Sequence, residues 1–227
     1  MPITTCVFDA YGTLFDVSAA ARMAAQDPAL SALSGTWADL AEDWRRKQLE
    51  YSWLRAITKQ HCDFWQVTKD GLDWAMDARG LKDPAMRKRL LQLYRELDAY
   101  PEVADVLARL REMGKATAIL SNGSPGMLAD AVTSAGLSDR LDAVISVEDI
   151  GIFKPSAKVY DLVGEHFVVR PQDVLFVSSN GWDAAAAASY GFRVAWVNRR
   201  GDPVDRMPGL PDHILSNLTQ ILDLDDI

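Results

Sequence analysis

CVFDAYGTLFD, residues 6–16, joins an apolar, β-prone segment to an aspartate and then to a glycine and a threonine. The pattern predicts a buried strand that delivers the Asp9 carboxylate at its C-terminal end. Open α/β sheets bind their ligands at the edge formed by these strand ends. Asp9 is therefore a candidate nucleophile. Tyr11 stands where a second carboxylate would have been a general acid, so the nucleophile lacks a proton donor beside it.

With this first run at residues 5–8, β-prone runs are expected at residues 116–120, 143–147, 174–177 and 194–197, with a weaker one around Ile214. Helical patterns lie between most of them, with apolar stripes formed by Val103, Val106, Leu107, Leu110 and Met113, and by Leu128, Ala131 and Val132. Strands that alternate with helices and read as continuous apolar runs predict an α/β fold with a doubly wound, parallel, Rossmann-like sheet.

The alternation breaks between the first strand and residue 100, where all the signals are helical. One apolar face is expected from Trp37, Leu40, Ala41 and Trp44, continued by Tyr51, Leu54 and Ile57; a later helix carries Met86, Leu90, Tyr94 and Leu97. We therefore expect an all-helical cap at residues 17–97, inserted into a core made of residues 1–16 and 98–227. Such a cap can fold over the sheet edge and exclude water from the site.

The composition excludes several classes of function. The chain has 227 residues, 48% of them hydrophobic, and a net charge of −8. This acidity, without any Lys/Arg-rich run, argues against a nucleic-acid partner. We expect no membrane span, no leader, and no disulfide between Cys6, in a strand, and Cys62, in a helical stretch, as in a cytoplasmic protein. His61, His166 and His213 lack ligand-like spacing, so no metal site is expected.

Four segments place polar groups directly after expected strands, where a parallel sheet brings them to one edge. They are Asp9 with Thr13, the run Ser121-Asn122-Gly123, Lys154, and the run from Ser178 to Asp183. Each alone also reads as an ordinary turn or cap signal, and the shared placement is what favours a site.

In order and spacing, these four segments resemble the four motifs of the haloacid dehalogenase superfamily over nearly the whole chain. Three stretches are most similar to the L-2-haloacid dehalogenases: Phe8-Asp9 with residues 11–17, Trp44-Arg45 with residues 47–51, and residues 178–180 with Trp182-Asp183. The resemblance implies hydrolysis of short L-2-haloalkanoic acids to D-2-hydroxyalkanoic acids without a cofactor, by a homodimer. Phosphatases of the superfamily have an aspartate at the position of Tyr11. A halide leaves without a proton, so the missing acid agrees with carbon–halogen cleavage.

The resemblance also implies roles for individual residues. Asp9 is the nucleophile, and Asp183 positions or deprotonates the water. Lys154 holds the Asp9 carboxylate, with Tyr160, Ser178 and Asn180 around it. Thr13 and Ser121 orient carboxylates of enzyme and substrate, and Arg45 and Asn122 receive the halide. The remaining substrate-binding positions form an apolar wall: Tyr11, Leu49, Phe64 and Trp182.

Three positions depart from the family pattern: Arg46 where glutamine is usual, Phe153 for tyrosine and Gly181 for alanine. We expect Arg46 to alter the substrate range or pocket charge, and Gly181 to loosen the loop that carries Asp183. Two alternatives remain open at this point. One is a magnesium-dependent phosphate or phosphonate hydrolase, which would use Asp9, Lys154 and Asp183 around the metal. The other is a non-catalytic binding module on the same scaffold.

Overall fold

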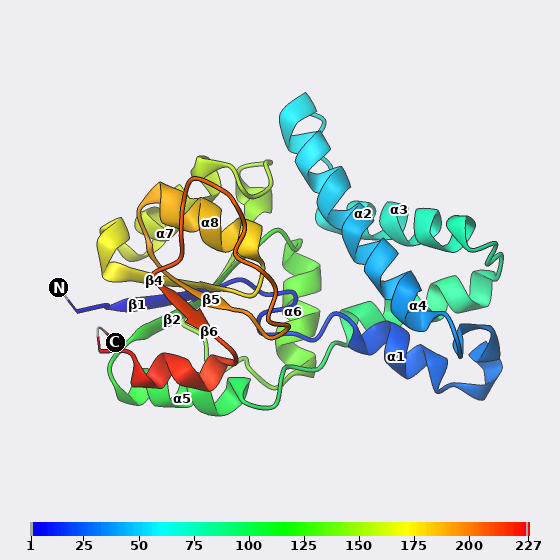
Figure 1. Ribbon diagram of the computed structural model, residues 1–227, viewed down its shortest axis with the longest axis horizontal. Coiled ribbons are helices and arrows are strands. Elements are labelled where there is room, and N and C mark those ends of the chain that lie inside the picture. The colour runs from blue at the N-terminus through cyan, green and yellow to red at the C-terminus, as the bar shows by residue number, and fades with distance from the viewer. Residues whose placement is uncertain (1, 226) are drawn as a thin grey trace.

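The computed structural model describes residues 2–225 and 227 and shows one parallel sheet with a helical region beside it (Figure 1). The strands are β1 (Thr5–Phe8), β2 (Ala116–Ser121), β3 (Ala143–Ser146), β4 (Val174–Ser178), β5 (Arg193–Val197) and β6 (His213–Leu215). Their order in the sheet is β3-β2-β1-β4-β5-β6, and every neighbouring pair is parallel. The predicted α/β class is confirmed.

Helices and short 3₁₀ turns connect the strands. They are α5 (Val103–Glu112), α6 (Pro125–Ser134), η2 (Val147–Asp149), α7 (Ala157–Phe167), η3 (Pro171–Asp173), α8 (Gly181–Tyr190) and η4 (Leu218–Asp223). Figure 1 shows α7 and α8 on one face of the sheet and α5 with η4 on the other. The central strand β1 is buried on both faces, which explains why Cys6, Val7 and Phe8 form a continuous apolar run rather than an alternating one. Met113, predicted to be on the buried stripe of α5, is 43% exposed because the helix has ended at Glu112.

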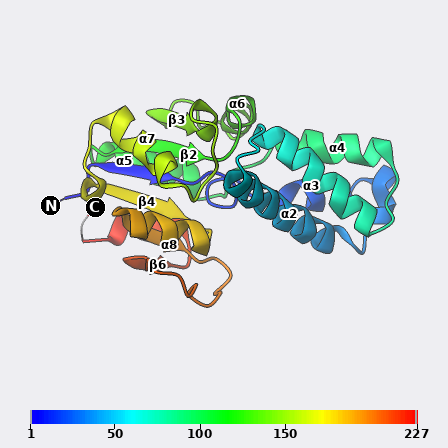
Figure 2. The same ribbon diagram turned by 90° about the horizontal axis from the view of Figure 1, so that it is seen from above.

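The helical region lies between β1 and β2 in the sequence, beyond the carboxyl ends of the strands (Figures 1 and 2). It consists of α1 (Ala19–Ala25), η1 (Pro28–Leu33), α2 (Trp37–Thr58), α3 (Phe64–Ala78) and α4 (Pro84–Arg95). Asp63 and Asp83 begin α3 and α4 by accepting backbone N–H groups of the first turn, at 2.8 Å for both Gln66 and Ala85. The chain enters and leaves this region side by side, since the Asp16 amide donates to the Asp98 carbonyl at 3.0 Å.

The prediction of the apolar face of α2 is wrong for the second half of the helix. Leu54 and Ile57 are 50% and 77% exposed, whereas Gln48 and Ser52 are buried in their place. The polar groups are accommodated because the Gln48 side chain donates to the Thr68 hydroxyl at 2.9 Å. A buried polar side chain with a partner costs little, so apolar periodicity did not identify the buried face.

Cys62 lies in the loop between α2 and α3, not in a helix as expected. Within residues 2–225 and 227, no helix combines the length and the apolar character needed to cross a membrane.

Candidate active site

Asp9 follows β1 directly and is held by three side-chain donors. Its carboxylate accepts hydrogen bonds from Thr13 Oγ1 at 3.1 Å and from Asn180 Nδ2 at 2.8 Å, both on Oδ2. Lys154 Nζ contacts the other oxygen, Oδ1, at 3.3 Å. The residue is only 7% exposed. One carboxylate, fixed in direction and nearly shielded from water, is therefore presented at the sheet edge.

Lys154 and Asp183 form a buried ion pair next to Asp9. Lys154 Nζ lies 2.8 Å from Asp183 Oδ2, and their side chains are 1% and 0% exposed. Burial by itself lowers the pKa of Lys154, but the Asp183 and Asp9 carboxylates outweigh it and raise that pKa above the usual 10.5. Burial raises the pKa of Asp183 above 3.8, although Lys154 opposes this. Lys154 therefore stays protonated and lies between two carboxylates.

Tyr160 and Ser178 contact Asp183 and not Asp9, which corrects the expected arrangement. Tyr160 Oη donates to Asp183 Oδ1 at 2.8 Å, and Ser178 Oγ donates to Oδ2 at 3.2 Å. Burial and the neighbouring Asp183 carboxylate raise the pKa of the Tyr160 phenol, so it is a hydrogen-bond donor and not an anion. With Lys154, these groups supply donors to both oxygens of Asp183 and fix its plane.

The loop after β1 is shaped to admit a side chain from the helical region. Gly12 has φ of +89°, and a Cβ at this position would lie 3.4 Å from the Arg45 guanidinium. Glycine adopts this conformation without steric cost and leaves the space open. Arg45, on α2, donates to Asn180 Oδ1 at 2.8 Å and to the Tyr11 carbonyl at 3.2 Å. A guanidinium from the helical region therefore reaches the same asparagine that holds Asp9.

Ser121 and Asn122 follow β2 at the same edge. The Ser121 hydroxyl accepts the Gly123 amide at 3.0 Å, which closes a tight turn. Asn122 Oδ1 accepts the backbone N–H of Lys154 at 2.9 Å. Asn122 therefore helps to position Lys154, a contact that the sequence did not predict, while its NH₂ group remains the donating end of the side chain.

Aromatic rings surround Tyr11 on the helical side of the site. Tyr11 is 5% exposed, stacks on Tyr94 with ring centroids 5.7 Å apart, and lies 6.4 Å from Phe64. Burial raises the pKa of Tyr11 well above 10, so its phenol stays neutral. Leu49 is half-buried on α2, one helical turn after Arg45. The structure thus brings Tyr11 and Phe64 together, and it adds Tyr94, which the sequence identified only as part of an apolar stripe.

Trp182 is half-buried near the start of α8 and contacts a residue that sequence reasoning missed. Its ring lies 5.4 Å from that of Trp53 on α2, at an interplanar angle of 80°. A tryptophan within a helical pattern usually indicates ordinary core. The one signal in the sequence that Trp53 lies near the site is its position eight residues after Arg45. Ser179 was missed as well; its backbone amide donates to Thr13 Oγ1 at 2.8 Å and orients that hydroxyl toward Asp9.

The three departures from the family pattern have different consequences. Arg46 is 49% exposed, pairs with Asp43 and lies over the Trp74 ring, so its contacts in the structure lie outside the Asp9 environment. Phe153 is fully buried, with its ring 5.9 Å from Phe64. A Cβ added at Gly181 would collide with the carboxylate of Asp205.

A magnesium ion does not fit the residues that are present. The position between the Asp9 and Asp183 carboxylates is taken by the Lys154 ammonium, which contacts both. Two residues after Asp9 the chain has the phenol of Tyr11 rather than a carboxylate. Across residues 2–225 and 227, no group of three or more His, Cys, Asp or Glu side chains has the geometry to hold a metal ion. No step of the reaction is therefore derived through a metal.

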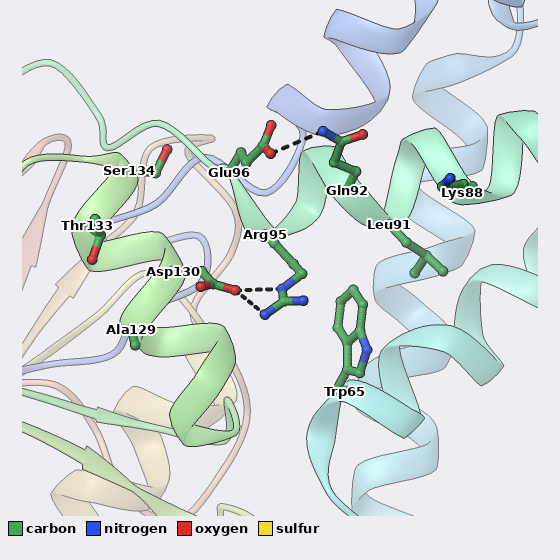
Figure 3. A pocket seen from close by; sticks show the side chains of 10 residues that line it. All are labelled: Trp65, Lys88, Leu91, Gln92, Arg95, Glu96, Ala129, Asp130, Thr133 and Ser134. Atoms are coloured by element: carbon green, nitrogen blue, oxygen red, sulfur yellow. Dashed lines mark hydrogen bonds and ion pairs between the residues drawn. The ribbon is translucent and has the colours of Figure 1, made fainter.

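A pocket of about 680 Å³ lies between α4 and α6, away from these residues (Figure 3). Arg95 of α4 crosses it to pair with Asp130 of α6, and its guanidinium also lies 5.5 Å from the Trp65 ring centroid. None of the predicted site residues lines this pocket. It is a groove bridged by an ion pair that links α4 of the helical region to α6.

The family model of the haloacid dehalogenase-like hydrolases matches residues 3–191. The chain is 42% identical to (S)-2-haloacid dehalogenase 1 of Pseudomonas sp. (strain CBS-3) over 97% of this chain and 95% of that protein. It is 46% identical to the (S)-2-haloacid dehalogenase of Xanthobacter autotrophicus over 87% and 76% of the two chains. The structure of the L-2-haloacid dehalogenase from Xanthobacter autotrophicus with chloropropionic acid covalently bound superimposes with a TM-score of 0.87, at 38% identity and 98% coverage of both chains. The chain therefore belongs to the haloacid dehalogenase-like hydrolases, on the branch formed by the (S)-2-haloacid dehalogenases.

Proposed function

We propose that this protein hydrolyses short L-2-haloalkanoic acids to D-2-hydroxyalkanoic acids through an ester on Asp9. The observation that carries the proposal is the environment of Asp9: a fixed carboxylate, a buried lysine in contact with it, and a neutral aromatic two residues later. The relatives named above are haloacid dehalogenases, and one solved relative has chloropropionic acid covalently bound, which supports a covalent route.

In the first step, Asp9 attacks the α-carbon from the side opposite the halogen. A carbon–oxygen bond forms as the carbon–halogen bond breaks, and the halide leaves with the bonding electron pair. One displacement at the chiral carbon inverts its configuration. Thr13, Asn180 and Lys154 hold the carboxylate in line, so little orientational freedom is lost on the way to the transition state.

In the second step, water attacks the carboxyl carbon of the Asp9 ester. The bond between this carbon and the ester oxygen breaks, and the hydroxy acid leaves with an oxygen that came from Asp9. Asp183 takes one proton from the attacking water and returns it to the leaving oxygen, which becomes the hydroxyl group of the product, and the second proton of the water is lost from Asp9 to solvent. The raised pKa that burial gives the Asp183 carboxyl favours its role as the base. Lys154 balances the charge that appears between the two aspartates.

The halide and the substrate carboxylate need donors. We assign the halide to Arg45 and to the NH₂ group of Asn122, because Arg45 already reaches the Asp9 environment and the Asn122 oxygen is occupied by Lys154. We assign the substrate carboxylate to Ser121 with neighbouring backbone amides. The apolar groups Tyr11, Leu49, Phe64 and Trp182 would surround the halogen and the alkyl chain.

Residues 17–97 are proposed to be a cap domain on a core of residues 1–16 and 98–227, divided where the chain crosses twice near Asp16 and Asp98. We also propose a homodimer, because Leu54 and Ile57 expose apolar surface on α2. A cytoplasmic location agrees with the two unpaired cysteines, of which Cys6 is buried with its thiol pKa raised to about 12.

Halide release from L- and D-2-chloropropionate, with and without a chelator, tests the proposal. We expect turnover of the L-acid alone, unchanged by the chelator. In a single turnover in heavy-oxygen water, the new oxygen of the product should be unlabelled because it comes from Asp9. A labelled first product would show direct attack of water on the substrate, and chelator-sensitive phosphate release from phosphate esters would replace the proposal with a phosphatase.

A further inference from the structure

The helix α2 and the start of α8 meet at two points. Arg45 donates to Asn180 at the first, and Trp53 packs against Trp182 at the second. Arg45, Leu49 and Trp53 are four residues apart and lie on neighbouring turns of one side of α2. Because Arg45 faces the Asp9 environment, the same side of the helix carries Trp53 toward the sheet edge.

The two contacts lie at different distances from the nucleophile. Asn180 contacts both Asp9 and Arg45, which places the first contact beside the reacting carboxylate. Trp53 is two helical turns from Arg45, a rise of about 12 Å along α2. An alkyl chain held between Leu49 and Trp182, as in the proposed function, would extend toward the second contact and not toward Arg45.

Trp53 and Trp182 are both half-buried, with their polar atoms turned inward. Both indole nitrogens are buried, and neither has a hydrogen-bond partner in the part of the chain that the structure describes. The rings meet edge to face, at 80°, which is a favourable arrangement for two aromatic side chains. Two large rings from different segments therefore pack against each other across the interface between the helical region and the sheet.

We propose that Trp53 is a specificity-determining residue that limits the length of the alkyl chain of the 2-haloalkanoic acid. With Trp182 it closes the end of the site that a longer chain would enter. This inference rests on the proposed function. Hydrophobic sites discriminate by size because each extra methylene needs space that a rigid ring does not give up. Short acids do not reach the indole and are indifferent to it.

The test compares kcat/KM for L-2-bromopropionate and L-2-bromohexanoate in the wild type, Trp53→Ala, Trp53→Leu and Trp53→Phe. In Trp53→Ala we expect the hexanoate-to-propionate ratio to rise by about tenfold or more, with a smaller rise in Trp53→Leu. Trp53→Phe should keep most of the wild-type limit because a ring remains. Trp74→Ala is the matched control, since Trp74 is on α3 against Arg46 and Lys47, and its ratio should not change.

The outcomes separate this inference from the function on which it rests. An unchanged ratio in Trp53→Ala and Trp53→Leu, with normal turnover of bromopropionate, would show that Trp53 only supports the fold. A wild type without activity on either bromoacid would remove the proposed function and the inference with it. If Trp53→Ala does not fold, Trp53→Leu carries the same comparison, and an equal loss for both acids would also count against a role in specificity.

Discussion

Lys154 donates to Asp183 at 2.8 Å, and neither side chain has more than 1% of its surface exposed. An ammonium group in such a place is stable only because two carboxylates surround it. Lys154 thus supplies a positive charge beside both Asp9 and Asp183, and it ties the protonation of the site to residues of the chain.

The pH profile of turnover should therefore be flat far into the alkaline range. Lys154 has a pKa of 10.5 in the unfolded chain and a higher one in the fold, so the stability that this pair contributes is complete below pH 10.5 and is lost as the pH rises through the folded value. On the acid side, kcat should fall at a pH above 3.8, because burial raises the pKa of Asp183. Halide release measured from pH 3 to 11, with circular dichroism at each pH to exclude unfolding, checks both limbs. A basic limb centred below 10.5 in folded protein would contradict the role of Lys154.

Replacing either aspartate should stop turnover at a different step. In Asp9→Asn no ester forms and no halide is released. In Asp183→Asn the ester should form and then persist, with hydrolysis slowed by about 10²- to 10⁴-fold because the general base is missing. Mass spectrometry after mixing with L-2-chloropropionate would show an adduct in Asp183→Asn and none in Asp9→Asn. Full turnover in Asp183→Asn would assign the base to another group.

Sequence reasoning identified the residues at the strand ends well because parallel strands carry their C-terminal residues to one edge. Asp9, Lys154, Asn180 and Asp183 therefore meet as predicted. It did not show that Tyr160 contacts Asp183, because either aspartate is compatible with the order of the motifs.

Side-chain direction within the helical region was the harder part. The sequence did not single out Trp53, and it predicted Leu54 and Ile57 to be buried, because hydrophobic periodicity does not register a polar side chain that finds a partner inside, as Gln48 does. Arg45 and Arg46 are adjacent in sequence, and their contacts alone show that the first enters the site and the second does not.

Gly123 should be required for the position of Tyr11. A Cβ at residue 123 would lie 2.8 Å from Tyr11 Cε2 and 3.1 Å from Leu128 Cδ2, so Gly123→Ala must displace the ring. We expect kcat/KM to fall by about 10- to 100-fold. Gly126→Ala is the control: nothing lies within 4 Å of its added Cβ, and alanine in α6 should stabilise the fold by about 0.5–1 kcal/mol without loss of activity. Equal kinetics for the two variants would mean that the ring moves without consequence.

Gly181 should tolerate alanine although the space beside it is filled. The group that its Cβ meets is the carboxylate of Asp205, an exposed side chain that can swing into solvent, and alanine favours α8 by up to about 1 kcal/mol. Gly209→Ala provides the contrast, because it meets the backbone of Ala185 and Ser189 in α8 and should destabilise the protein by about 1–3 kcal/mol. Urea unfolding of both variants measures the difference. A loss in Gly181→Ala as large as that in Gly209→Ala would show that Asp205 is held in place.

Arg46→Gln should leave the kinetics unchanged, although it restores the residue usual in the family. The Arg46 guanidinium lies 2.9 Å from Asp43 and 5.0 Å from the Trp74 ring centroid, on the solvent side of α2, so its charge is screened from the substrate. We expect kcat/KM for L-2-chloropropionate and for longer acids to remain within about twofold, the effect of a screened surface charge. Arg45→Gln, one residue earlier, is the matched control and should lose most activity, because it removes the donor to Asn180 and the proposed halide site. A changed substrate range in Arg46→Gln would require its side chain to turn into the site during catalysis.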